Sequence, residues 1–90
     1  MPRYVVERKF PNGMPIKPDA EGAAIAAKVV ERNAALGVTW LHSYVDESKT
    51  KTFCIYDAPD PEAVRKAAER NGLPVDAITQ VRVLDPYFNR

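Results

Sequence analysis

The sequence predicts an α+β fold, a ferredoxin-like β-α-β-β-α-β sandwich in which a four-stranded antiparallel sheet carries two helices on one face. Two amphipathic helical patterns alternate with segments of strand character in that order. Between them, residues 38–59 contain two β-prone runs around a polar turn, which is typical of a β-hairpin. The length of 90 residues suits one domain, 1–90.

The first strand is predicted over residues 3–9, where Val5 and Glu7 lie on the same side of an alternating pattern. The last strand is predicted over residues 78–84, which are rich in β-branched side chains. For this order of elements, the adjacency and handedness rules place the first and third strands in the middle of the sheet. The first strand of the hairpin then lies at an edge.

The first helix is predicted over residues 20–36, where apolar side chains recur at helical spacing. Asp19 is a suitable N-cap, and Gly37 suits the helix end, where a left-handed residue is often required. The second helix is predicted to begin at Asp60-Pro61-Glu62, with a cap, a proline and an acid in sequence. It is predicted to stop at Asn71-Gly72.

The hairpin is predicted as strands 38–46 and 50–57 with a three-residue turn at 47–49. That turn would fix the register of the two strands. The directly opposed pairs would be Trp40 with Tyr56, His42 with Cys54, and Tyr44 with Thr52. Because plain aliphatic side chains suit the helix-covered face, we expect the six paired side chains on the open face, together with Glu7 and Arg82.

An open face so rich in aromatic area should not remain in water. We therefore expect a symmetric homodimer in which two sheets pack face to face, a dimeric α/β-barrel-type assembly with a pocket between the subunits. The C-terminal aromatic residues Tyr87 and Phe88 are also expected to pack, on the same subunit or on a neighbour.

The composition argues against several functions. The 13 basic and 12 acidic residues are interleaved and give a net charge of +1, so the chain lacks the basic stripe of a nucleic-acid-binding protein. No apolar run is long enough to span a membrane, and the N-terminus does not resemble a signal peptide. A single cysteine cannot form an intramolecular disulfide, which suits a reducing compartment. We expect a cytoplasmic protein.

His42, the chain's one histidine, is the first candidate metal ligand, because imidazole is the commonest metal ligand in proteins. The alternative is a histidine that is satisfied by a neighbouring hydroxyl or carbonyl group. Cys54 is either a small buried hydrophobic residue or, opposite His42, a second ligand. Glu7 is either a solvated carboxylate or a third ligand. A set of His, Cys and carboxylate suits nickel, zinc or copper better than calcium or magnesium.

Four further residues are predicted to line a pocket or bind a ligand on the open face: Trp40, Tyr44, Tyr56 and Arg82. The tyrosines are packing residues that carry a polar group. Arg82 is either a partner in a structural salt bridge or the residue that holds an anionic ligand.

Four segments carry a family resemblance, namely MPRYVVERKFP, VTWLHSY, KTFCIYDAP and PEAVRKAAERNGLPVD. Over these segments the sequence resembles a small bacterial family of nickel-binding, ferredoxin-like proteins that has long been catalogued as a domain of unknown function. The resemblance implies a homodimer of ferredoxin-like subunits that binds nickel and sequesters or detoxifies the metal. His42 is the natural ligand under this resemblance.

The residues leave two other functions open. One is a cofactor-free enzyme of the dimeric α/β-barrel type, an isomerase or monooxygenase, in which His42, Tyr44 and Glu7 handle protons. The other is a protein that binds a small ligand in the pocket on the open face. Between metal binding and catalysis, the sequence favours metal binding.

Overall fold

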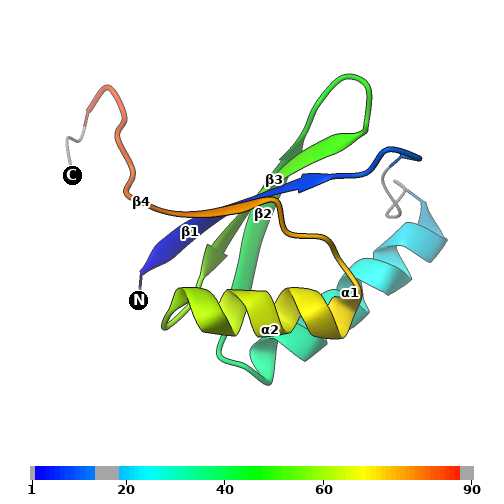
Figure 1. Ribbon diagram of the computed structural model, residues 1–90, viewed down its shortest axis with the longest axis horizontal. Helices are drawn as coiled ribbons and strands as arrows, with labels where there is room; N and C mark the ends of the chain where they lie inside the picture. Colours follow the sequence, from blue (N-terminus) through cyan, green and yellow to red (C-terminus); the bar gives the residue numbers. More distant parts are fainter. Residues whose placement is uncertain (1, 14–18, 88–90) are drawn as a thin grey trace.

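The elements follow the predicted β-α-β-β-α-β order in a computed structural model that describes residues 2–13 and 19–87. They are β1 (Arg3–Lys9), α1 (Ala20–Ala34), β2 (Thr39–Val45), β3 (Lys51–Asp57), α2 (Pro61–Asn71) and β4 (Ala77–Val81). The strands form one antiparallel sheet in the order β2-β3-β1-β4, so β1 and β3 are central as predicted. Both helices lie on one side of this sheet (Figure 1). The ferredoxin-like fold is therefore confirmed.

Local sequence signals fix the N-termini of both helices and the C-terminus of α2, whereas α1 ends at Ala34, two residues earlier than predicted. Asp19 Oδ1 accepts a hydrogen bond from Gly22 N at 2.7 Å, and Asp60 Oδ1 accepts one from Ala63 N at 2.8 Å. Each N-cap satisfies an amide that has no partner inside its helix. At the end of α2, Gly72 adopts the left-handed conformation at φ 67°, as its sequence position predicts.

The hairpin turn is one residue longer than the sequence analysis predicts. Asp46 N donates to Lys51 O at 3.1 Å, which leaves residues 47–50 as the loop. The carboxylate of Asp46 closes this loop, because its Oδ1 accepts from Thr50 N and Lys51 N, both at 3.0 Å. Lys49 takes the left-handed conformation at φ 60°. These side-chain hydrogen bonds, which are of the Asx-turn type, stabilise the four-residue loop relative to a tighter turn.

The longer turn changes the register of the hairpin. Ser43, not His42, lies opposite Cys54, and His42 lies opposite Ile55. A β-bulge between Trp40 and His42 then shifts the register back. The predicted Trp40–Tyr56 pair is therefore confirmed, and the predicted His42–Cys54 and Tyr44–Thr52 pairs are wrong.

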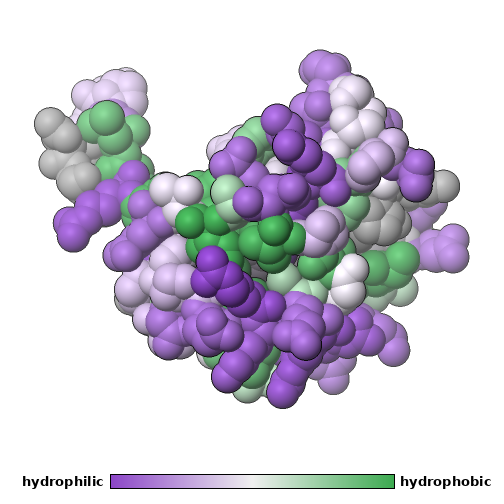
Figure 2. Space-filling model, in the orientation of Figure 1, coloured by the Kyte–Doolittle hydropathy of each residue, from purple (hydrophilic) through white to green (hydrophobic). Residues whose placement is uncertain are grey.

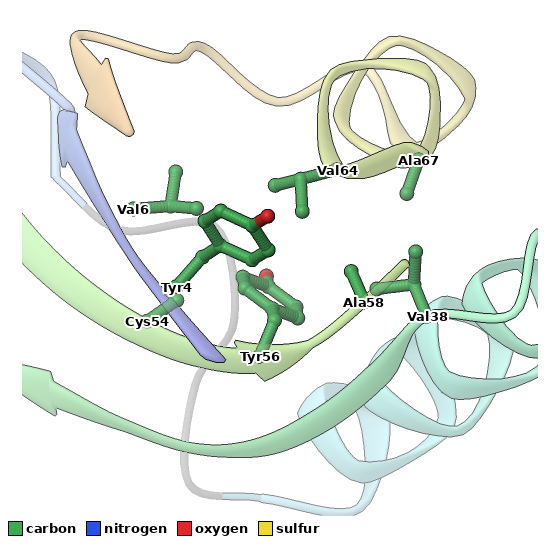
Figure 3. Close-up of a cluster of buried hydrophobic side chains, with 8 residues drawn as sticks. All are labelled: Tyr4, Val6, Val38, Cys54, Tyr56, Ala58, Val64 and Ala67. Atoms are coloured by element: carbon green, nitrogen blue, oxygen red, sulfur yellow. The ribbon is translucent and has the colours of Figure 1, made fainter. Parts of the chain in front are cut away.

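The core lies between the sheet and the helices. It is built on the even-numbered residues of β1 and β3, which are buried along both strands. Figure 3 shows Tyr4 of β1 and Tyr56 of β3 with their rings side by side, directed toward Val64 and Ala67 of α2. The core members are Tyr4, Val6, Val38, Cys54, Tyr56, Ala58, Val64 and Ala67. Large tyrosine rings on the sheet fill the space that the small alanine side chains of the helices leave.

The outward surface of α2 is hydrophilic, whereas α1 exposes Ile25 and Val30. In Figure 2, hydrophilic residues cover the lower part of the molecule, where α2 lies, and apolar residues gather next to it around β4. Among the described residues, no helix combines the length and the apolar character that crossing a membrane requires.

Candidate functional site

The side of the sheet away from the helices is the open face. It carries the odd-numbered residues of β1 and β3 and two residues of β2. These side chains form two rows across the strands: Val5, Ile55 and His42 in one row, and Glu7, Phe53 and Tyr44 in the next. His42, Tyr44 and Glu7 therefore lie on the predicted face, and none of the three lies in the buried core.

His42 is exposed on this face and contacts Tyr44. The two ring centroids are 5.1 Å apart and the rings meet edge to face at 85°. Glu7 lies on β1, with β3 between it and the strand of His42. Neighbouring strands lie about 4.8 Å apart, so the backbones of β1 and β2, which have β3 between them, are roughly 10 Å from each other. The two residues are also offset along the strands, because they belong to different rows of the open face.

Cys54 is buried on the opposite face of the sheet, where its Sγ contacts Thr52 Oγ1 at 3.7 Å. The three predicted ligands, His42, Cys54 and Glu7, consequently do not converge within one subunit. Within residues 2–13 and 19–87, no group of three or more His, Cys, Asp and Glu side chains is arranged to hold a metal ion. A complete site would require ligands from outside a single subunit.

Trp40 and Tyr56 also face the helices, and so the prediction that they lie on the open face is wrong. The bulge after Trp40 turns its side chain inward, and the ring Nε1 donates to Ser43 Oγ at 2.8 Å. Tyr56 is only 4% exposed. Among the four predicted pocket residues, Tyr44 alone lies on the open face of the sheet.

Arg82 lies just beyond the sheet. The last strand ends at Val81, three residues earlier than predicted, and Arg82 is exposed in the segment that follows. Figure 1 shows that this segment leads away from the body of the molecule. Tyr87 near its end is 90% exposed and does not pack on its own subunit, whereas Phe88 lies outside the described residues.

A cavity of about 180 Å³ lies between the covered face of the sheet and α1. It brings together Trp40, Cys54 and Tyr56, which the sequence analysis predicts as site residues, but on the helix-covered side of the sheet and not on the open face. Among the described residues, those that line it are Arg8, Phe10, Val29, Trp40, Ser43, Val45, Thr52, Cys54, Tyr56 and Leu73. Most of this lining is apolar. Val45 is 41% exposed, so the cavity reaches the surface beside the hairpin.

Arg8 is the unusual residue in this cavity, because its side chain is charged and only 2% exposed. Its Nη1 donates to Tyr56 Oη at 3.3 Å, and the guanidinium carbon lies 5.7 Å from the centre of the Tyr56 ring. Its Nε has no hydrogen-bond partner among the described residues. All 12 Asp and Glu residues are described, and none lies within ion-pair distance of Arg8.

Tyr56 does not neutralise this charge. Burial raises the pKa of its phenol to about 12, although the nearby Arg8 acts in the opposite direction. The phenol is therefore neutral at physiological pH, and it offers Arg8 a dipole and an aromatic face rather than an anion. Within the described residues, the cavity thus combines an apolar lining with an uncompensated positive charge.

Sequence reasoning missed Arg8, although a signal for it was present. The alternation that places Val5 and Glu7 together on one side of β1 also places Arg8 on the opposite side, between the sheet and the helices. A charge at such a position is rare unless it is paired. The missing step was to extend the alternation to the end of the strand.

Comparisons with known proteins agree with the fold. A crystal structure of SCO4226 from Streptomyces coelicolor A3(2) superimposes on the model with a TM-score of 0.71, at 18% sequence identity, over 92% of this chain and 99% of that chain. No curated protein is significantly similar to the sequence. The family model described as "Nickel responsive protein SCO4226-like" matches residues 4–81, from the second residue of β1 to the end of β4. The chain therefore belongs to the SCO4226-like family of nickel-responsive proteins.

Proposed function

We propose that this protein is a cytoplasmic nickel-binding homodimer that sequesters or detoxifies the metal, and that His42 is its principal ligand. The observation that carries the proposal is the position of His42. In a chain of a nickel-responsive family, the one histidine is exposed on a sheet face that no described element of the subunit covers. Imidazole nitrogen is a preferred ligand of nickel.

A dimer through the open face would supply what one subunit lacks. Val5, Phe53 and Ile55 are only partly buried there, and Tyr44 is 63% exposed. Apolar area of this kind favours association with a second copy. A two-fold axis through the face would also bring a second histidine and a second set of carboxylates near His42. The dimer and the nickel site are therefore linked parts of one proposal.

Nickel binding is tested with untagged protein, because a histidine tag would bind the metal itself. Calorimetric titration with nickel chloride should show saturable binding, and the melting temperature should rise with nickel concentration, since binding to the folded state stabilises it. His42→Ala should abolish both effects. Cys54→Ser is the matched control, and it should bind nickel normally because Cys54 lies on the other face. Nickel binding that survives His42→Ala would contradict the proposal.

The dimer is tested separately by analytical ultracentrifugation. Ile55→Lys places a charge in the middle of the open face and should yield a monomer. Ala27→Lys introduces the same side chain at an exposed position of α1 and should leave the dimer intact. A wild-type protein that is monomeric at all concentrations, with or without nickel, would refute the face-to-face assembly.

A further inference from the structure

We propose that the cavity around Arg8 is a binding site for a small organic anion, a carboxylate attached to an apolar body about the size of one aromatic ring. This site lies on the helix-covered side of the sheet. It is separate from the proposed nickel site at His42, which is on the open face. The proposal does not depend on nickel binding.

The charge of Arg8 is the first argument. A guanidinium group stays protonated in proteins, so burial cannot turn it into a neutral group as it can a lysine. Arg8 is almost fully buried, with only 2% of its surface exposed, and its Nε lacks a hydrogen-bond partner within the described residues. A buried charge is normally retained only with an ion pair or with several hydrogen bonds. The one polar contact to Tyr56 Oη falls short of this requirement.

The shape and lining of the cavity are the second argument. The volume of about 180 Å³ is close to that of an engineered apolar cavity of about 150 Å³ that binds benzene. Trp40, Val29 and Leu73 supply apolar surface for a ring or a short branched chain.

The charge and the lining together determine the chemistry of the ligand. A carboxylate matches the planar geometry of a guanidinium and can accept two parallel hydrogen bonds from it. Ser43 and Thr52 add hydroxyl groups to the same cavity. A purely apolar ligand would leave Arg8 unpaired, and a bare inorganic anion would leave the apolar walls unfilled. The ligand therefore needs both parts.

Binding is measured with metal-free protein in EDTA, by the fluorescence of Trp40, which is the chain's one tryptophan and lines the cavity. Benzoate is the probe, benzyl alcohol is the neutral ligand of similar size, and acetate carries the charge without the ring. Benzoate should bind saturably and about ten-fold or more tightly than either comparison ligand, because it alone makes both kinds of contact. Benzoate binding no tighter than that of benzyl alcohol would overturn the proposal.

Two further measurements locate the site. Arg8→Met should remove the preference for benzoate over benzyl alcohol, whereas Arg3→Met, on the same strand and the other face, should preserve it. An unchanged preference in Arg8→Met would assign Arg8 a purely structural role. If Arg8→Met does not fold, the wild-type protein still provides a test through Cys54, which lines the cavity. Bound benzoate should slow the reaction of its thiol with a thiol reagent, and an unchanged rate would contradict binding there.

Discussion

Each face of the sheet departs in part from the usual distribution of side chains. The face beneath the helices holds a buried arginine, a threonine and a cysteine beside its tyrosines. The open face carries valine, isoleucine and phenylalanine at the centre of β1 and β3. In most two-layer proteins the aliphatic side chains of a sheet turn inward and the polar ones outward. Here each face contains residues typical of the other.

The difference suggests that both faces are built to be covered. The helices of the same subunit cover one face, and the unpaired charge of Arg8 on that face is the reason for proposing an anionic ligand. Among residues 2–13 and 19–87 nothing covers the open face, and its apolar residues are the reason for proposing a dimer. The comparison can therefore be tested with the same substitution made once on each face.

The largest effect is expected for a tyrosine pair. Tyr4→Ala should lower the free energy of unfolding by about 3–5 kcal/mol, because the ring is buried in the core and its loss leaves a large void. Tyr44→Ala removes the same group from the open face, where it is 63% exposed, and should cost less than about 1 kcal/mol in the monomer. Urea denaturation at low protein concentration measures both values. Equal losses would mean that the faces are not distinct.

A valine pair on one strand provides a smaller and closer comparison. Val6→Ala should cost about 2–3 kcal/mol, since Val6 is fully buried. Val5→Ala, one position earlier on the open face, should cost less than half as much in the monomer. If the open face forms the dimer interface, the cost of Val5→Ala should increase with protein concentration. A cost that does not change with concentration would separate Val5 from any interface.

The sequence predicted the fold well because the signals for it are local. The caps at Asp19 and Asp60, and Gly72 after α2, each act within a few residues. The order of strands follows from general rules of chain connection. None of these signals depends on which face of a strand is buried, so errors about the faces did not affect them.

The candidate site was predicted less well, because it depends on the register of two strands. A single extra residue in the turn displaced His42 from Cys54, and the bulge after Trp40 then turned its side chain to the other face. The turn is closed by hydrogen bonds to the Asp46 carboxylate, and the bulge is an irregularity of the backbone; an alternating pattern reveals neither feature. The preference of aliphatic residues for a covered face was also misleading, because here Phe53 and Ile55 occupy the open face.

The hydroxyl group of Tyr56 is the polar partner of Arg8 inside the covered face. Tyr56→Phe removes the hydroxyl that accepts from Arg8 and leaves the guanidinium with no acceptor among the described side chains. The expected cost is about 1–3 kcal/mol, the usual penalty for a buried group that loses its partner. Tyr44→Phe on the open face is the control and should be neutral in the same urea titration. A neutral Tyr56→Phe would show that this hydroxyl does not support Arg8.

The smallest effect is expected at the turn that decides which side chains reach each face. Asp46 accepts hydrogen bonds from Ser48 Oγ at 2.6 Å and from the amides of Thr50 and Lys51, and these bonds hold its pKa below the ordinary value of 3.8. Its contribution to stability is therefore fully present above pH 3.8 and is lost as the pH falls through the lowered pKa of the folded state.

Asp46→Ala should consequently lower the melting temperature slightly at neutral pH, and the difference from the wild type should shrink below pH 3.8. Glu47→Ala, the neighbouring exposed acid in the same loop, is the control and should show no such dependence on pH. The chemical shifts of His42 and Trp40 would report whether the register holds in Asp46→Ala. The melting temperature and the chemical shifts of Asp46→Ala could instead match those of the wild type at neutral pH. The backbone alone would then fix the turn, and the Asp46 carboxylate would not determine which side chains lie on each face.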